Sequence, residues 1–246
     1  MGLKITARIM WYSVKRPRPD ALYAMLDGLS PAIVEDNRGM GCWWTARQCW
    51  QHGIDSGATH ILVLADDALP CKNFPAALEH AVASRPNHIL NFTSQTNDVR
   101  RFAKEAFDSG KSWVDLGLSW CSGVSLLMPR AMAIEFLAWA DEHVKEGANN
   151  DEMITALFAA TTDRRICCSS SSLVEHDPAC ESTINKGMKN SAQRTYRWAG
   201  DEADKIIWSS EGEPCWSGAH LVVSANRTQL KPRSSLFARY RLEWSV

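Results

Sequence analysis

The sequence of 246 residues lacks several features that mark the commonest classes of specialised protein. It has no apolar run near the roughly 18 residues that a membrane-spanning helix requires, so we expect no transmembrane segment. Residues 1–10 lack the apolar core and the small-residue cleavage site of a secretory signal. The eight cysteines include no CxxC pair with zinc spacing, so we expect reduced thiols in a cytoplasmic protein.

Phosphate-binding signatures are also missing. The sequence has no GxGxxG motif after the first predicted strand and no GxxxxGK[ST] motif at any position. This excludes the usual phosphate-binding loops of dinucleotide-binding and P-loop proteins. Charge of one sign is not in large excess, because 27 Lys and Arg stand against 28 Asp and Glu. Internal repeats are absent, and 45% hydrophobic with 22% charged residues is ordinary for a globular protein. A bound nucleotide would therefore need some other group to neutralise its phosphates.

The first 94 residues contain a regular alternation of strand and helix patterns. We expect strands over residues 3–12, 31–36, 60–65 and 88–94, and helices over residues 20–29, 42–56 and 73–84. Such an alternation predicts an α/β fold with a Rossmann-like, mostly parallel central sheet flanked by helices.

The second half of the chain changes character. We expect strands over residues 112–116, 124–128 and 164–178, and helices over residues 129–146, 151–160 and near 193–207. We place one folded domain at residues 1–184 and a basic C-terminal extension, packed on the same domain, at residues 185–246. This extension holds ten Lys and Arg against six Asp and Glu, which hints at an anionic partner.

Two adjacent carboxylates end the third predicted strand. The stretch HILVLADDALP places Asp66 and Asp67 directly after the apolar residues, and Pro70 closes the turn. Like charges side by side repel unless a positive group or a proton joins them. In parallel sheets the ligand lies beyond the carboxyl ends of the strands, where Ser13 and Asp36 also fall. We therefore expect the two aspartates to hold a metal ion at this edge.

With these residues placed, the chain resembles the GT-A superfamily of nucleotide-sugar glycosyltransferases, nearest to the small family-2-like enzymes of bacteria and phages. The resemblance covers roughly residues 4–184 and rests on a succession of weak motifs. The family typically ends a strand with Asp-x-Asp and a proline three residues on. In LVLADDALP, Asp67 and Pro70 match this register, whereas Ala65 stands at the first aspartate.

Further motifs would complete a site of this family. Arg47 in WWTARQCW matches an Ala-Arg pair that contacts the nucleotide or its phosphates, and Asp36 matches the position that holds the base or ribose. WCSGVSLLMPRAM resembles the segment that lines the sugar and acceptor sites, with Trp120 placed to pack a sugar or a base. NNDEMITAL resembles the Glu-Asp-x-x-Leu motif, with Asp151 as catalytic base. SLVEHDPACESTI resembles the closing segment, where His176 would complete the metal site.

The resemblance implies a GT-A fold, with a smaller mixed sheet on the acceptor side, and a metal-dependent glycosyltransferase. Mn²⁺ or Mg²⁺ on Asp66, Asp67 and His176 would compensate the charge of a departing diphosphate, with a UDP-sugar as the favoured donor. Asp151 would take the proton of the acceptor hydroxyl in an inverting transfer. The nucleotide-sugar-binding residues would be Ser13, Asp36, Arg47, Asp66 and Trp120.

The acceptor is the least determined part of this reading. The basic, aromatic-bearing C-terminal end could follow the phosphate backbone of DNA. Some phage enzymes of this type glycosylate hydroxymethylated bases in DNA, and such a base must leave the stack. A phage-encoded chain of this kind would act in the host cytoplasm. Glycan, protein and small-molecule acceptors stay open beside DNA.

Two rival functions stay open as well. A nucleotidyltransferase uses a similar sheet and acidic metal site, but its glycine-rich, basic loop after the first strand is matched here only by the basic WYSVKRPRP. A sugar- or nucleic-acid-binding module without catalysis is the other rival, which Ala65 permits. Locally, Asp151 could simply cap its helix. Asp36 could be a plain turn residue, and Arg47 could form an ion pair with an acidic neighbour. His176 could be a surface or packed imidazole.

Overall fold

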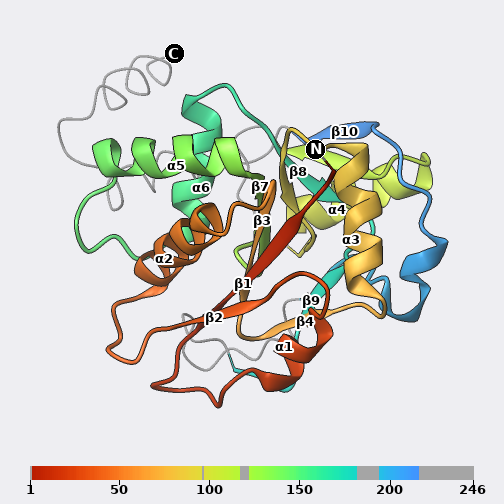
Figure 1. Ribbon diagram of the computed structural model, residues 1–246. Helices are drawn as coiled ribbons and strands as arrows, with labels where there is room; N and C mark the ends of the chain where they lie inside the picture. The colour runs from red at the N-terminus through yellow and green to blue at the C-terminus, as the bar shows by residue number, and fades with distance from the viewer. Residues whose placement is uncertain (1, 96, 117–121, 182–193, 216–246) are drawn as a thin grey trace.

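A central sheet with helices on both faces forms the body of the molecule (Figure 1). The computed structural model describes residues 2–95, 97–116, 122–181 and 194–215. Within these residues the main sheet has eight strands in the order β10-β6-β8-β5-β7-β3-β1-β2. Their bounds are β1 Ile5–Trp11, β2 Ala32–Glu35, β3 His60–Ala65, β5 Ile89–Asn91, β6 Trp113–Leu116, β7 Ser125–Pro129, β8 Ile166–Ser169 and β10 Gly212–Cys215. The expected α/β fold with a helix-flanked sheet is confirmed.

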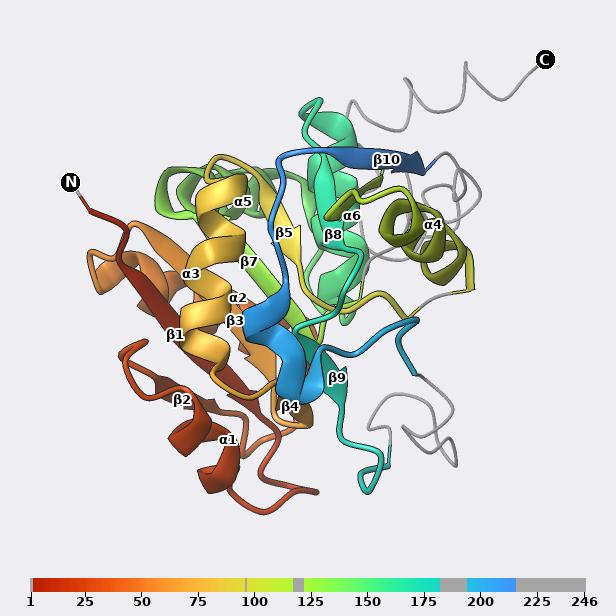
Figure 2. The same ribbon diagram turned by 90° about the vertical axis from the view of Figure 1, so that its right-hand side faces the viewer.

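Each face of the sheet carries its own helical layer (Figure 2). Ile61 and Val63 of β3 pack with the layer of α2, α4, α5 and α6. Leu62 and Leu64 point the other way, toward α1, α3 and the 3-10 helix η2, because successive strand side chains alternate. A strand covered on both faces is apolar throughout, as HILVLA predicts. The helices span α1 Asp20–Met25, α2 Cys42–Asp55, α3 Phe74–Ser84, α4 Asn97–Asp108, α5 Arg130–His143, α6 Asp151–Thr161 and η2 Gly200–Lys205.

The main sheet is mixed, and each of its antiparallel pairs includes a strand from the second half of the chain, β7 or β8. β1 runs parallel to β2 and β3, β5 parallel to β8, and β10 parallel to β6. β7 is antiparallel to both β3 and β5, and β6 is antiparallel to β8. A second, small sheet pairs β4 (Ala68–Pro70) with β9 (Val174–His176) in antiparallel fashion. This small sheet lies directly after the aspartate pair and helps to position it.

Sequence reasoning missed α4 and β10 and merged two strands into one. The strand expected over residues 164–178 is β8 and β9, which belong to different sheets. Between them the backbone N–H of Ser172 donates to the carbonyl of Arg197 at 2.8 Å, so a distant segment fixes the break. The helix expected near residues 193–207 is the shorter η2. These elements are short and depend on partners far away in the sequence.

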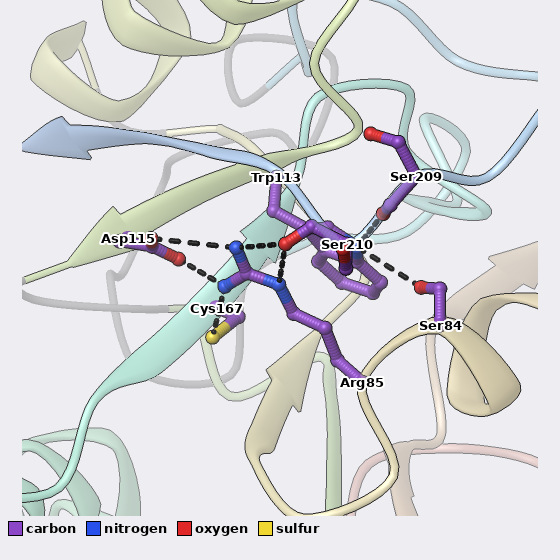
Figure 3. Close-up of polar contacts among 7 residues, drawn as sticks. All are labelled: Ser84, Arg85, Trp113, Asp115, Cys167, Ser209 and Ser210. Carbon is purple, nitrogen blue, oxygen red and sulfur yellow. Dashed lines mark hydrogen bonds and ion pairs between the residues drawn. The ribbon is translucent and has the colours of Figure 1, made fainter.

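Arg85 ties the segment before β10 to the rest of the sheet. Figure 3 shows its guanidinium directed at Asp115, at the thiol of Cys167 and at the carbonyl of Ser210. Arg85 donates to Ser210 O from Nε at 2.9 Å and from Nη2 at 2.7 Å, and it forms an ion pair with Asp115. Trp113 packs beneath the guanidinium, 5.8 Å from ring centroid to Cζ. The described residues 194–215 of the expected extension therefore pack on the main body, while the boundary at residue 184 stays a prediction.

Candidate functional site

The carboxyl ends of β1, β2 and β3 meet at one edge of the sheet. Met10 pairs with Ala65, and Trp11 pairs with Glu35, so the residues that follow these three strands come together. Asp66 follows β3, and its Oδ2 accepts the backbone N–H of Tyr12 at 2.9 Å. The predicted convergence of strand ends around Asp66 is thus present in the fold.

Arg16 binds both aspartates from the loop after β1. Its Nε lies 3.3 Å from Asp66 Oδ1, and its Nη2 lies 2.9 Å from Asp67 Oδ2. The same Nη2 donates to the carbonyl of Glu181 at 2.6 Å. Burial raises the pKa of Asp66 to about 6, while the Tyr12 N–H and the Arg16 charge act in the opposite direction. Arg16 is thus the counter-ion that two adjacent carboxylates require.

Sequence reasoning overlooked Arg16 as a site residue. The basic loop that contains it stood out only as a poor match to a nucleotidyltransferase loop. Burial alone would lower the pKa of Arg16, but the charges of Asp67 and Asp66 raise it. The available signal was the pair of uncompensated carboxylates together with a basic loop at the same sheet edge.

His176 lies beside the aspartates, as predicted. It pairs with Ala68 across the small β4–β9 sheet, and the next backbone N–H, of Asp177, donates to the Asp67 carbonyl at 2.8 Å. The His176 residue is 8% exposed, and its Nδ1 has no hydrogen-bond partner among the described residues. Burial lowers its pKa, against the charges of Asp67 and Glu175. A buried ring nitrogen without a partner is available for a ligand.

The arrangement of these side chains does not fit a divalent cation. Within the described ranges, no group of three or more His, Cys, Asp and Glu side chains gathers closely enough to hold a metal ion. Arg16 pairs with one oxygen of Asp66 and one of Asp67, the other Asp66 oxygen accepts the Tyr12 N–H, and Ala65 adds no carboxylate. Mg²⁺ requires near-octahedral oxygen ligation, and a guanidinium at the same oxygens repels a second positive charge. Mn²⁺ or Mg²⁺ on Asp66, Asp67 and His176 stays a prediction from the sequence.

Asp151 is a buried carboxylate at the first turn of α6. The N-cap of this helix is Asn150, whose side chain accepts the backbone N–H of Met153 at 2.9 Å. Asp151 itself is 6% exposed, and burial raises its pKa to about 6. Because its neighbour fills the N-cap position, helix capping does not explain why a carboxylate is buried here.

Asp151 and the aspartate pair lie near the same strand end, because Asp151 Oδ2 lies beside Gly123 and the next residue, Val124, accepts the N–H of Ala65 at 3.0 Å. Cys42, the first residue of α2, is affected by the charges of both groups. Burial raises the pKa of the Cys42 thiol to about 12, and the charges of Asp151, Glu152, Asp66 and Asp67 raise it further. The Cys42 backbone N–H donates to the side-chain carbonyl of Asn149 at 2.8 Å, which holds the start of α2 against the loop before α6. The fold therefore brings the predicted base and the predicted metal ligands into one region.

Other predicted site residues have structural partners. The carboxylate of Asp36 accepts three backbone N–H groups in the turn before α2, from Arg38 at 3.2 Å and from Met40 and Gly41 at 2.9 Å. Burial acts to raise the Asp36 pKa, but these hydrogen bonds bring it below the ordinary value. Asp36 therefore closes a turn at the correct sheet edge, and its role toward a nucleotide stays a prediction.

Arg47 reaches across to α5 instead of toward the aspartates. Its Nη2 lies 2.8 Å from Asp141 Oδ1 in a partly exposed ion pair. Ser13 is half-buried in the turn after β1, close in sequence to Arg16. Trp120 lies outside the described residues. The proposed contacts of these three residues with a donor remain predictions.

A separate cavity of about 370 Å³ lies beside Arg85. Its lining includes residues that precede β5 and β8, so it opens at the amino ends of these strands, opposite the aspartate edge. The charged groups around it are Arg85, His88, Asp115 and Arg165. Arg85 is already bound to Asp115 and to the Ser210 carbonyl, so we place the candidate functional site at the aspartate edge.

Comparisons with known proteins give distant structural similarity only. No family model and no curated protein matches the chain. TarS from S. aureus, solved in complex with UDP-GlcNAc, shares 10% identity over 73% of this chain and 62% of that chain, with a TM-score of 0.46. Mannose-1-phosphate geranyltransferase from Thermus thermophilus shares 11% identity over 68% and 74%, with a TM-score of 0.40. A protein from STIV shares 14% over 70% and 84%, with a TM-score of 0.41.

Among the helices that the structure describes, none is both long and apolar enough to cross a bilayer.

Proposed function

We propose that this chain is a glycosyltransferase that moves a sugar from a nucleotide-sugar donor, with a UDP-sugar favoured, to a hydroxyl acceptor. One observation carries the proposal: the buried carboxylate of Asp151 lies beside Gly123, and the next residue, Val124, accepts the N–H of Ala65 at 3.0 Å, immediately before the Asp66–Asp67 pair. A group-transfer site of this kind needs a base for the acceptor and a positive group for the leaving diphosphate, and in this proposal Asp151 and the Arg16 bound to the aspartate pair serve these roles.

Asp151 acts as the general base in this proposal. Its carboxylate takes the hydroxyl proton while the acceptor oxygen bonds to the anomeric carbon of the sugar. The bond from that carbon to the diphosphate breaks, and a nucleoside diphosphate leaves. A positioned base contributes roughly 10²–10⁴-fold to such a step. A single direct displacement inverts the anomeric centre, which agrees with the expected inverting mechanism.

The value of the Asp151 pKa suits this role. At about 6 it lies nearer to neutral pH than an ordinary aspartate, so the carboxylate is both deprotonated and more basic. We expect kcat to rise with pH through about 6 as Asp151 loses its proton. No step above depends on Mn²⁺ or Mg²⁺, because Arg16 already pairs with two of the predicted ligands, Asp66 and Asp67.

DNA with hydroxymethylated bases remains our candidate acceptor. The sequence of residues 185–246 carries the basic and aromatic side chains that this acceptor calls for. A gel shift on duplex and single-stranded DNA at increasing salt tests it. Binding that weakens steeply with salt supports a phosphate-tracking surface, and no binding at about 50 mM salt removes DNA as the acceptor.

A nucleotidyltransferase is the second candidate, and the position of Arg16 favours it. Arg16 comes from the loop after β1, where nucleotidyltransferases carry their basic loop, and it reaches the acidic residues at the sheet edge. The two functions differ in what they release. A nucleotidyltransferase releases pyrophosphate from a nucleoside triphosphate, whereas a glycosyltransferase releases a nucleoside diphosphate. A chain that binds these ligands without turnover would be the non-catalytic module.

The test is a release assay over a panel of nucleotide sugars and nucleoside triphosphates, with and without Mn²⁺. We expect nucleoside diphosphate release from one nucleotide sugar, reduced about 100-fold or more in Asp151→Asn. The matched control is Asp163→Asn, an exposed aspartate beyond the end of α6. Release of pyrophosphate instead, or full activity in Asp151→Asn, would contradict the proposal.

A further inference from the structure

We infer that Arg16 takes the place of a divalent cation at the aspartate pair, and that this site binds a diphosphate without metal. The identity of the ligand as a diphosphate rests on the proposed function. The place of Arg16 at the aspartates rests on the geometry of the described residues alone. No residue role derived from the sequence includes Arg16.

Arg16 occupies the position that a metal ion would need. Its Nε and Nη2 lie 3.3 Å and 2.9 Å from one oxygen each of Asp66 and Asp67. Side-chain exposure is 10% for Arg16, 10% for Asp66 and 9% for Asp67, so water screens this pairing only weakly. The Nη2 bond to the Glu181 carbonyl at 2.6 Å fixes the guanidinium from a third segment of the chain. A dication that bridged Asp66 Oδ1 and Asp67 Oδ2 would have to displace Arg16 from both oxygens.

Two buried nitrogens beside this pair still lack partners. Arg16 Nη1 and His176 Nδ1 are both shielded from solvent and make no hydrogen bond to any described residue. Both belong to side chains around Asp67, whose charge acts on each of them. A buried guanidinium N–H that makes no hydrogen bond costs free energy, so we expect an oxygen acceptor to bind it. A phosphate oxygen matches the planar donors of arginine particularly well.

Arg16 of the loop after β1 reduces the negative charge of the aspartate pair. Lys15, next to Arg16, places its Nζ over the Tyr12 ring at 5.8 Å from the centroid, on the same loop. Arg16 pairs directly with Asp66 and Asp67, whereas Lys15 is exposed and contacts the Tyr12 ring. The bound guanidinium therefore lessens the negative charge that Asp66 and Asp67 present to a phosphate group, while Glu175 and Asp151 remain acidic neighbours.

The experiment uses two simple probes on the full chain: Mn²⁺ alone, and inorganic pyrophosphate in excess EDTA, both by calorimetry. We compare the unsubstituted protein with Arg16→Gln and Arg16→Lys. The matched control is Arg18→Gln on the same loop, because Arg18 is 61% exposed and pairs only with Asp20 at 3.1 Å among the described residues. Circular dichroism confirms that each variant is folded.

We expect pyrophosphate to bind the unsubstituted protein in EDTA, and to bind about tenfold or more weakly to Arg16→Gln. Arg16→Lys keeps the charge but loses the planar fork, so its affinity falls in between. Mn²⁺ binds measurably only to Arg16→Gln, because this change frees the two carboxylates. Arg18→Gln behaves as the unsubstituted protein in both titrations.

Three results would overturn the inference. They are pyrophosphate binding that requires Mn²⁺, no pyrophosphate binding at all, and equal binding in EDTA by the unsubstituted protein and Arg16→Gln. Failure of the proposed function is distinguishable from these. A chain that binds pyrophosphate through Arg16 but releases no nucleoside diphosphate from any nucleotide sugar keeps the metal-free site and loses the glycosyltransferase assignment.

Discussion

Replacing Arg85 by methionine tests whether a buried ion pair holds the C-terminal described segment in place. The Arg85 side chain is 9% exposed and that of its partner Asp115 is 15% exposed. Arg85→Met leaves the Asp115 carboxylate without a counter-ion and leaves the Ser210 carbonyl without two donors. Breaking a buried pair from one side costs about 3–5 kcal/mol. We take ~3 kcal/mol here, because Asp115 keeps some contact with water.

The magnitude can be measured by urea unfolding and by thermal melting. For a chain of this size, about 3 kcal/mol corresponds to a fall in Tm of roughly 6–12 °C. The double variant Arg85→Met/Asp115→Leu should regain much of this loss, since it removes the unpaired charge as well. The control is Arg164→Met, whose pair with Glu135 is largely exposed and should change stability by at most about 1 kcal/mol.

Two outcomes would refute this reasoning. A loss below about 1 kcal/mol for Arg85→Met would mean that the ion pair is no stronger than a surface pair. A double variant as unstable as the single one would mean that the Ser210 contacts, rather than the charge of Asp115, account for the loss. Hydrogen exchange at residues 208–215 then separates the two contributions, because release of this segment alone raises exchange there.

Three further predictions concern stability and the site. The pKa of Asp66 is raised on folding, so its own contribution to stability should be full below about pH 4 and be lost as pH rises through about 6. Asp66→Asn should remove this part of the pH dependence in urea unfolding, and a pH dependence equal to that of the unsubstituted protein would count against it. Gly53→Ala would place a Cβ 2.3 Å from Ile61 Cγ2, so it should lower stability by about 1–3 kcal/mol in urea unfolding, whereas no loss would show that α2 can shift. Gly123→Ala would place a Cβ 2.7 Å from Glu152 Cγ, next to the candidate base Asp151, so kcat should fall while Tm changes little. A kcat equal to that of the unsubstituted protein would show that this turn does not belong to the site.

Local patterns in the sequence were enough to predict the longer elements, whose burial pattern is clear. β3 is apolar at every position because helices cover both of its faces, and α2 shows its buried residues at helical spacing. β9 and β10 are short strands that exist because β4 and β6 offer them hydrogen bonds. With three and four residues, these strands carry little strand signal of their own. The sequence pattern therefore merged β9 with β8 and missed β10.

The same distinction applies to the candidate site. The position of Asp66 and Asp67 follows from the end of a strand, which a sequence pattern can locate. The approach of Arg16 depends on the conformation of an irregular loop that places it beside partners about 50 residues away in sequence. Arg47 shows the same limit, since its helix turns it toward Asp141, a residue that only the packing of α2 on α5 brings near, and its contact with a nucleotide stays a prediction.

The position of β10 at one end of the sheet order also matters for handling the protein. β10 covers the hydrogen-bonding edge of β6, which is otherwise the last strand on that side within the described residues. A shortened form that ends before Gly212 would present the bare backbone of β6 to other molecules, and exposed strand edges of this kind promote self-association. Shortened versions that are to remain monodisperse should therefore retain Cys215.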